Sequence, residues 1–138
     1  MALTVLDAGV VIAILDGRDV HREVAIRAVA AAMDRGDDLV LPASAYAEVL
    51  VALHRRGTDA VETVDAFLDA LPAVIEPATR VAARRAADLR ARHGKAVRLP
   101  DALVIATALA LGAECVITTD GRWPSLPVPV EVAGSSAG

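Results

Sequence analysis

Aromatic residues are nearly absent from this chain of 138 residues. Tyr46, Phe67 and Trp123 make up 2% of it, while hydrophobic residues of all kinds make up 55%. The core must therefore be built from Ala, Val, Leu and Ile, and the length predicts one compact domain. The same scarcity means that stacking of nucleic-acid bases on aromatic rings can contribute little to any binding.

Cysteine and long hydrophobic runs are also scarce. Cys115 is the only cysteine, so no disulfide can form within one chain, and a reducing, cytoplasmic setting is expected. The longest uncharged run, Ala102 to Ala113, is shorter than the roughly 20 residues that a bilayer requires. Asp7 interrupts the apolar N-terminal segment, which has no preceding positive charge, and this argues against a signal peptide. We expect no membrane association.

Positive charge is in deficit overall but is concentrated in one segment. The net charge of −4 by itself disfavours binding to nucleic acid. Half of the 14 Lys and Arg residues nevertheless lie between residues 80 and 98, where only Asp88 opposes them: Arg80, Arg84, Arg85, Arg90, Arg92, Lys95 and Arg98. This basic strip is either an ordinary solvated helix face or a surface for an anionic partner.

Short, uniformly apolar segments alternate with segments of helical character. Strands are predicted at residues 3–6, 39–41, 73–75, 115–117 and 128–132, and helices at 9–15, 20–35, 44–56, 59–70, 78–92 and 100–111. This alternation is typical of an α/β fold with a parallel sheet covered on both faces. We expect one domain over residues 1–132, followed by a flexible tail at 133–138.

Four carboxylates interrupt apolar segments near the ends of predicted strands or the starts of predicted helices. They are Asp7, Glu48, Asp101 and Asp120. Each has an ordinary structural explanation: Asp7 as a helix cap, Glu48 and Asp101 through the helix dipole, and Asp120 as a turn residue. Glu48 is nevertheless expected to face inward, because its helical neighbours are small or apolar, and Asp101 is expected to be buried.

A single bound cation cluster explains all four positions at once. Ligands in parallel sheets bind at the carboxyl ends of the strands, where Asp7 and Asp120 are expected. Oxygen ligands without His or Cys favour Mg²⁺ or Mn²⁺ over zinc. Such ions activate water for in-line attack on a phosphodiester, which would leave 5′-phosphate and 3′-hydroxyl ends. The sequence therefore predicts metal-assisted phosphate chemistry.

The motifs around these acids resemble those of the PIN-domain ribonucleases, and their order and the chain length resemble the VapC-type toxins of bacterial toxin-antitoxin pairs. They are Asp7 after the first strand, Glu48 in an early helix turn, Leu-Pro-Asp-Ala-Leu at Asp101 and Thr-Thr-Asp-Gly-Arg-Trp at Asp120. The resemblance spans residues 3 to about 131. It implies an α/β/α sandwich with a mostly parallel sheet, and a nuclease that uses Mg²⁺ or Mn²⁺ to cleave single-stranded RNA.

The resemblance also implies roles for individual residues. The four acids would be the catalytic, metal-binding residues, and the RNA would run along the basic strip, in particular along Arg84, Arg85, Arg92, Lys95 and Arg98. Gly9 departs from the family pattern, which often has Ser, Thr or Asn there, so Thr118 or Thr119 is expected to supply the missing hydroxyl. A cognate antitoxin and a homodimer are the implied partners.

Three other functions compete with a nuclease. A haloacid-type phosphatase also has an Asp after its first strand, but it requires an Asp-x-Asp motif, and Asp7-Ala8-Gly9 supplies one acid. A non-catalytic PIN-like protein-binding domain would use the acids only as helix caps or for a structural ion. A receiver-type signalling module lacks support, because no paired acids follow the first strand and no Lys ends a late one.

Overall fold

The computed structural model describes residues 2–57 and 59–135, in which helices and strands alternate as expected. The strands are β1 (Leu3–Leu6), β2 (Asp38–Pro42), β3 (Ala73–Glu76), β4 (Cys115–Thr118) and β5 (Val130–Val132). The α-helices are α1 (Ala8–Leu15), α2 (Arg22–Asp34), α3 (Ala43–Arg55), α4 (Ala60–Ala70), α5 (Arg80–His93) and α6 (Leu99–Leu111), and a short 3₁₀-helix, η1 (Gly94–Ala96), joins α5 to α6.

The five strands form one sheet in the order β3-β2-β1-β4-β5, and every neighbouring pair is parallel. The prediction of a parallel α/β sheet is confirmed. Because all strands run the same way, their carboxyl ends meet at one edge of the sheet. The central strands β1 and β4 align Leu6 with Ile117, so the residues that follow these two strands are neighbours in space.

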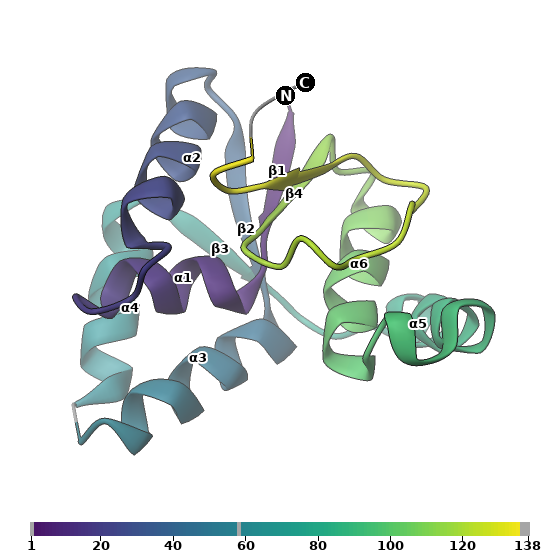
Figure 1. Ribbon diagram of the computed structural model, residues 1–138, viewed down its shortest axis with the longest axis horizontal. Coiled ribbons are helices and arrows are strands. Elements are labelled where there is room, and N and C mark those ends of the chain that lie inside the picture. The colour runs from purple at the N-terminus through teal and green to yellow at the C-terminus, as the bar shows by residue number, and fades with distance from the viewer. Residues whose placement is uncertain (1, 58, 136–138) are drawn as a thin grey trace.

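Helices cover the sheet on both faces (Figure 1). Helix α6 packs on β1, β2 and β4 with α5 against its outer side, and α1 contacts α2 and α3 on the other face. The core is aliphatic, and its largest fully buried side chains include Leu6, Leu41, Ile105 and Ile117. Tyr46, Phe67 and Trp123 only pack against the margin of this core, as the composition predicts.

Helix α6 is apolar almost all round, which explains its central position. Pro100 lies in its first turn, where a missing N–H is harmless, and Gly112 ends the helix in the left-handed conformation with φ of 65°. The connection from α5 to α6 is held by Arg90, whose Nη1 donates to the carbonyl oxygens of Gly94 and Val97. Arg90 is therefore a structural member of the basic strip.

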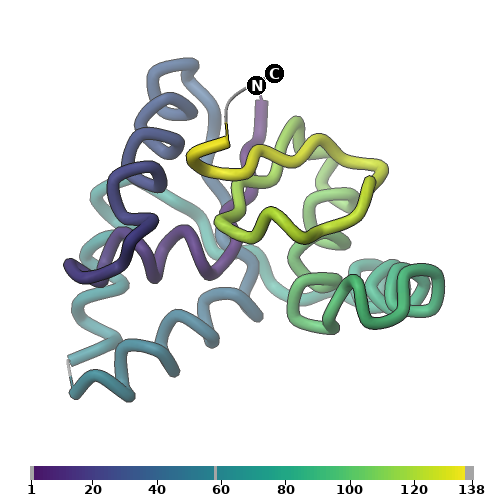
Figure 2. Tube along the Cα trace, in the orientation of Figure 1, coloured from purple at the N-terminus to yellow at the C-terminus, as the bar shows by residue number. Residues whose placement is uncertain are grey.

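Strand β5 lies at one edge of the sheet, as expected from Pro129, and it is part of the yellow C-terminal segment in Figure 2. The N–H of Ala133 donates to the carbonyl oxygen of Thr118, and Ala133 is buried. The predicted domain boundary at residue 132 stays a prediction, and residues 136–138 of the predicted tail lie outside the described residues. Within the described residues, no helix is both long and apolar enough to span a membrane.

Candidate active site

The four predicted acids come from four different elements that meet at the carboxyl edge of the sheet. Asp7 directly follows β1, and its N–H donates to the carbonyl oxygen of Ile117 in β4 at 3.0 Å. Asp120 follows β4 two residues later, Glu48 lies in α3, which begins directly after β2, and Asp101 lies in the first turn of α6. The parallel topology therefore brings together residues up to 113 positions apart in the chain.

Asp7 is the most buried of these acids, with 8% of its surface exposed. Its Oδ1 accepts the N–H of Ala8 at 2.9 Å, and its Oδ2 accepts the hydroxyl of Thr118 at 2.8 Å. The pKa of Asp7 is raised to about 6: burial raises it most, the hydrogen bonds from Thr118 and Ala8 lower it, and the charges of Asp101 and Glu48 add to the rise. Asp7 does cap α1, as the structural explanation holds, but its charge has no cationic partner among the described residues.

Glu48 differs from the expectation in its exposure. The residue is exposed rather than inward-facing, and Val51 on the same stripe is 48% exposed, because the buried face of α3 is Ala45, Val49 and Leu53. The prediction that the whole stripe faces the core is wrong. The carboxyl nevertheless has a raised pKa, first from partial burial and then from the charge of Asp101, while Arg98 lowers it. Glu48 is also beyond the first turn of α3, so the helix dipole does not explain it.

Asp101 is half-buried, so the expectation of complete burial is too strong. Burial raises its pKa and the charge of Asp120 raises it further, whereas Arg98, Trp123 and Arg122 lower it. The indole Nε1 of Trp123 is buried, has no hydrogen-bond partner in residues 2–57 and 59–135, and lies near enough to Asp101 to lower the pKa of its carboxyl.

Asp120 has a partner that the sequence analysis did not assign. Its carboxylate receives the guanidinium of Arg122 in a two-pronged ion pair, with Nε to Oδ1 at 3.0 Å and Nη2 to Oδ2 at 3.3 Å. The backbone N–H of Arg122 also donates to Oδ1, which closes a turn. The pKa of Asp120 is lowered, mainly by the hydrogen bond from Arg122. Asp120 therefore does act as a turn residue, and its partner Arg122 is the Arg of the motif Thr-Thr-Asp-Gly-Arg-Trp.

Thr118, the last residue of β4, and Thr119, which follows it, lie in different surroundings. Thr118 is completely buried and joins two of the acid-bearing segments, because its hydroxyl donates to Asp7 and accepts the N–H of Asp120 at 3.1 Å. Thr119 lies against Gly9: a Cβ added to Gly9 would meet Thr119 Oγ1 at 2.7 Å. The Thr119 hydroxyl thus occupies the space that a side chain at position 9 would need.

Within the basic strip, Arg98 and Lys95 lie closest to the acids. Arg98 lowers the pKa of both Glu48 and Asp101, and a small cavity of about 180 Å³ is lined by Lys95, Ala96, Arg98, Asp101, Asp120 and Arg122. Arg84, Arg85 and Arg92 are exposed on α5, and Arg92 pairs with Asp88 at 2.9 Å. The strip is therefore divided, and its C-terminal part adjoins the acids.

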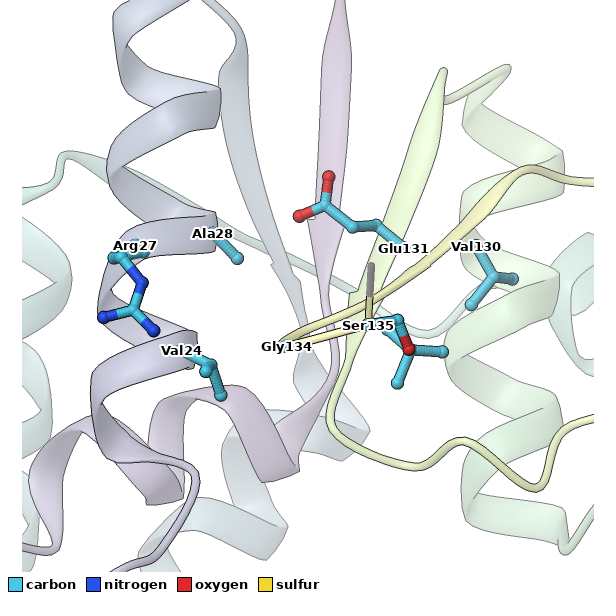
Figure 3. A pocket seen from close by; sticks show the side chains of 8 residues that line it. Val24, Arg27, Ala28, Val130, Glu131, Gly134 and Ser135 are labelled. Carbon is cyan, nitrogen blue, oxygen red and sulfur yellow. The ribbon is translucent and has the colours of Figure 1, made fainter. Parts of the chain in front are cut away.

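The larger cavity, of about 670 Å³, lies elsewhere, between α2 and the segment around β5 (Figure 3). Its lining contains none of the four acids. Figure 3 shows Val24 and Arg27 on α2 at one side of the cavity, and Val130, Glu131 and Ser135 of the C-terminal segment at the other. Size alone does not identify the reactive site here, because the smaller cavity is the one lined by two of the acids with perturbed pKa values, Asp101 and Asp120.

The mutual effects of the acids on one another show that they lie within electrostatic reach. Asp101 acts on Asp7 and Glu48, and Asp120 acts on Asp101. In the described residues 2–57 and 59–135, however, no three His, Cys, Asp or Glu side chains are arranged to hold one metal ion. The donor set suits a hard divalent cation in its chemistry, since three carboxyls have raised pKa values and a cation would offset their repulsion.

Comparison with known protein families identifies the family of this chain. The family model described as "PIN domain" matches residues 4–128, which is most of the chain. The chain belongs to the PIN-domain family. The match includes all four acids, both threonines and the whole basic strip. No curated protein sequence matches this PIN domain.

Solved structures agree with this assignment at the level of the fold. VapBC2 of Rickettsia felis, bound to a promoter DNA fragment, has a TM-score of 0.74 at 14% identity, over 94% of this chain and 97% of that one. VapC20 of Mycobacterium tuberculosis, a toxin that cleaves the sarcin-ricin loop, has 0.71 at 19%, over 86% and 90%. A toxin-antitoxin complex from Klebsiella pneumoniae has 0.68 at 22%, over 90% and 92%. The predicted PIN-like α/β/α architecture is confirmed.

Proposed function

We propose that this PIN-domain protein is an Mg²⁺- or Mn²⁺-dependent endoribonuclease that cleaves single-stranded RNA and acts as the toxin of a toxin-antitoxin pair. The observation that carries the proposal is the group of carboxylates at the carboxyl edge of the sheet. Three of them have raised pKa values, and Arg98 lies beside two of these. Perturbed acids next to a basic surface suit a site that receives both a cation and a polyanion.

Asp7, Glu48, Asp101 and Asp120 would hold the metal. Bound divalent ions supply activated water and stabilise negative charge on the leaving oxygen. Thr118 fixes the direction of the Asp7 carboxylate and ties the loop that carries Asp120 to it. Arg98 supplies positive charge next to Glu48 and Asp101, where a substrate phosphate would approach.

RNA recognition would rest on phosphate contacts and RNA shape. Arg84, Arg85, Arg92, Lys95 and Arg98 are all exposed and are proposed to contact the RNA, and few aromatic side chains are available for stacking. The similarity to VapC20, whose description names the sarcin-ricin loop as its target, supports RNA as the substrate class.

An antitoxin and a second copy of the chain are the proposed partners. The fold similarity to a Klebsiella pneumoniae toxin-antitoxin complex supports the first. Exposed apolar side chains provide surface for either, among them Val20 at 89% exposure, Val74 at 61% and Leu99 at 53%. A cytoplasmic location follows from an RNA target and remains part of the proposal.

The direct test incubates the purified protein with total RNA in Mg²⁺, in Mn²⁺ and in a chelator, alongside Asp101→Asn. Asp69→Asn is the matched control, because Asp69 is exposed on α4 and outside the group of acids. Cleavage should occur in either metal with the wild-type protein and with Asp69→Asn. It should stop in the chelator and in Asp101→Asn. The 5′ ends of the products should carry phosphate.

Two rival functions predict other results. If the acids serve only as caps or as a structural ion site, as in a protein-binding domain, Asp101→Asn leaves the RNA pattern unchanged. The pairing of Asp120 with Arg122 favours that rival, so the Asp101 comparison is decisive. The haloacid-type phosphatase has no remaining support, because the PIN-domain model accounts for the region around Asp7.

A further inference from the structure

Among the described residues, Arg122 is the one cation that forms an ion pair with a member of the acid group, and the proposed nuclease chemistry leaves it without a role. Its guanidinium occupies both oxygens of Asp120, at 3.0 and 3.3 Å, yet its own side chain is 90% exposed. Exposed ion pairs add little stability, because water competes for both charges. This contact can therefore be exchanged for another at small cost.

The surroundings of Arg122 are suited to an anion. The cavity of about 180 Å³ beside it is lined by Lys95 and Arg98 from the segment that leads into α6, and by Arg122 from the loop after β4. Two acids, Asp101 and Asp120, complete the polar lining, so three positive charges face two negative ones. Once a cation neutralises those acids, the cavity becomes strongly positive.

Asp120 cannot serve the guanidinium and a divalent ion equally well. Both carboxylate oxygens are engaged by Arg122, and a divalent ion at Asp120 would repel the positive side chain. The planar fork of Arg matches the oxygens of a phosphate as well as those of a carboxylate. The released side chain is long and makes no other hydrogen bond or ion pair with the described part of the chain, and it already lines the cavity in which Lys95 and Arg98 lie.

We propose that Arg122 is an exchangeable counter-ion: it neutralises Asp120 when no metal is bound, and it binds an RNA phosphate in the neighbouring cavity once metal takes that carboxylate. This inference rests on the proposed function, since it assumes metal at the acids and RNA along the basic strip. It makes metal binding and RNA binding cooperative, because each favours the released state of Arg122. Such coupling is reciprocal between the two ligands.

The experiment compares RNA affinity with and without metal. A short fluorescein-labelled single-stranded RNA is titrated with protein, in a chelator and in Ca²⁺, in the cold, with a gel to confirm that the RNA remains intact. The proteins are the wild type, Arg122→Gln, Arg122→Lys and Arg27→Gln. Arg27 is the matched control, since it is also an exposed arginine paired with a carboxylate, Glu23, but lies on α2.

The expected result is a loss that depends on metal. In Ca²⁺, Arg122→Gln should lower the slope of log affinity against log salt by about 0.7, the value for one phosphate contact on a single strand. Over a tenfold salt step this slope corresponds to roughly fivefold in affinity. In the chelator the slope should not change. The gain in affinity that Ca²⁺ gives the wild type should therefore shrink in Arg122→Gln, persist in Arg27→Gln and largely return in Arg122→Lys.

The proposal is overturned if Arg122→Gln loses the same factor in both conditions, which is the behaviour of a fixed surface charge. It is also overturned if Arg122→Gln loses nothing, or if Ca²⁺ leaves wild-type RNA affinity unchanged. Each of these outcomes can coexist with metal-dependent cleavage that Asp101→Asn abolishes, so failure of this inference is distinguishable from failure of the nuclease function. Circular dichroism melting of each variant confirms that it is folded.

Discussion

Asp7→Asn should make the metal-free protein more stable at neutral pH, although it removes a central acid of the proposed site. Asp7 is almost completely buried, and its negative charge has only hydrogen-bonding partners, Ala8 and Thr118. An amide of the same shape can replace the carboxylate without carrying the charge into the interior. The variant thus separates the cost of the charge from the packing of the side chain.

The magnitude follows from the pKa. The pKa of Asp7 is raised from 3.8 to about 6, mainly by burial, a difference of about 2 units, and each unit corresponds to about 1.4 kcal/mol. The ionised form therefore destabilises the folded state by about 3 kcal/mol. In the variant, the hydroxyl of Thr118 loses a carboxylate acceptor, which costs about 1 kcal/mol. The net gain at neutral pH is about 2 kcal/mol.

The sign depends on pH. A carboxyl whose pKa is raised by folding contributes stability that is fully present below its unfolded pKa, near 4, and is lost as the pH rises through about 6. Relative to the wild type, Asp7→Asn should be less stable by about 1 kcal/mol near pH 4, where only the Thr118 contact is lost. It should become more stable by about 2 kcal/mol above pH 7.

The assay is urea unfolding in a chelator at several pH values, with the difference between the two proteins taken at each pH so that other titrating groups cancel. Added Mn²⁺ should stabilise the wild type and not the variant, because ligands that bind only the folded state raise its stability. A difference between the proteins that does not change between pH 4 and 8 would refute the argument, since it would mean that Asp7 carries no buried charge.

Three further predictions follow from the same contacts. Gly9→Ala should be neutral or destabilising in the wild type, because its Cβ would meet Thr119 Oγ1 at 2.7 Å. In a Thr119→Ala background the same change should stabilise the fold by about 0.5–1 kcal/mol through helix propensity. Additive effects of the two changes in urea unfolding would contradict the contact. Thr118→Val should lower the free energy of unfolding by about 1–3 kcal/mol, since the Asp7 carboxylate and the Asp120 N–H lose their partner. It should also reduce RNA cleavage more than Thr119→Val does. Equal losses of activity would count against a positioning role for Thr118. RNA affinity should fall steeply with salt, and Arg98→Gln should lower the slope of log affinity against log salt by about 0.7. A wild-type affinity that does not change with salt concentration would exclude the basic strip as the RNA path.

The agreement between sequence and structure is closest where the information is local. Helix α6 is an example: Pro100 and Gly112 fix its ends, and its uniformly apolar residues require a position between layers. The strands were equally predictable, because short runs of Val, Leu and Ile that alternate with helices are typical of a parallel sheet covered on both faces. Their order in the sheet was not predicted, since it depends on which helix crosses which face.

The errors came from residues whose surroundings are set by packing. The helical neighbours of Glu48 are small or apolar in sequence, but α3 turns Ala45, Val49 and Leu53 toward the core and leaves Glu48 exposed. Asp101 was expected to be completely buried, yet it sits at the open end of α6 and is half-exposed. A helical pattern gives the period of the buried face and only approximately its direction.

By itself, the sequence determined the α/β class, the order of the elements, the placement of Asp7 and Asp120 after strands and that of Asp101 at the start of a helix, because apolar periodicity and turn residues act over a few neighbouring positions. The tertiary structure alone decided that Thr118 holds Asp7, which lies 111 residues away, and that Thr119 fills the space beside Gly9. It also decided that Arg98 reaches Glu48 and Asp101 from the basic strip. These contacts depend on how β1 and β4 pair and on how α6 approaches α3, and such distances arise only when the whole core is packed.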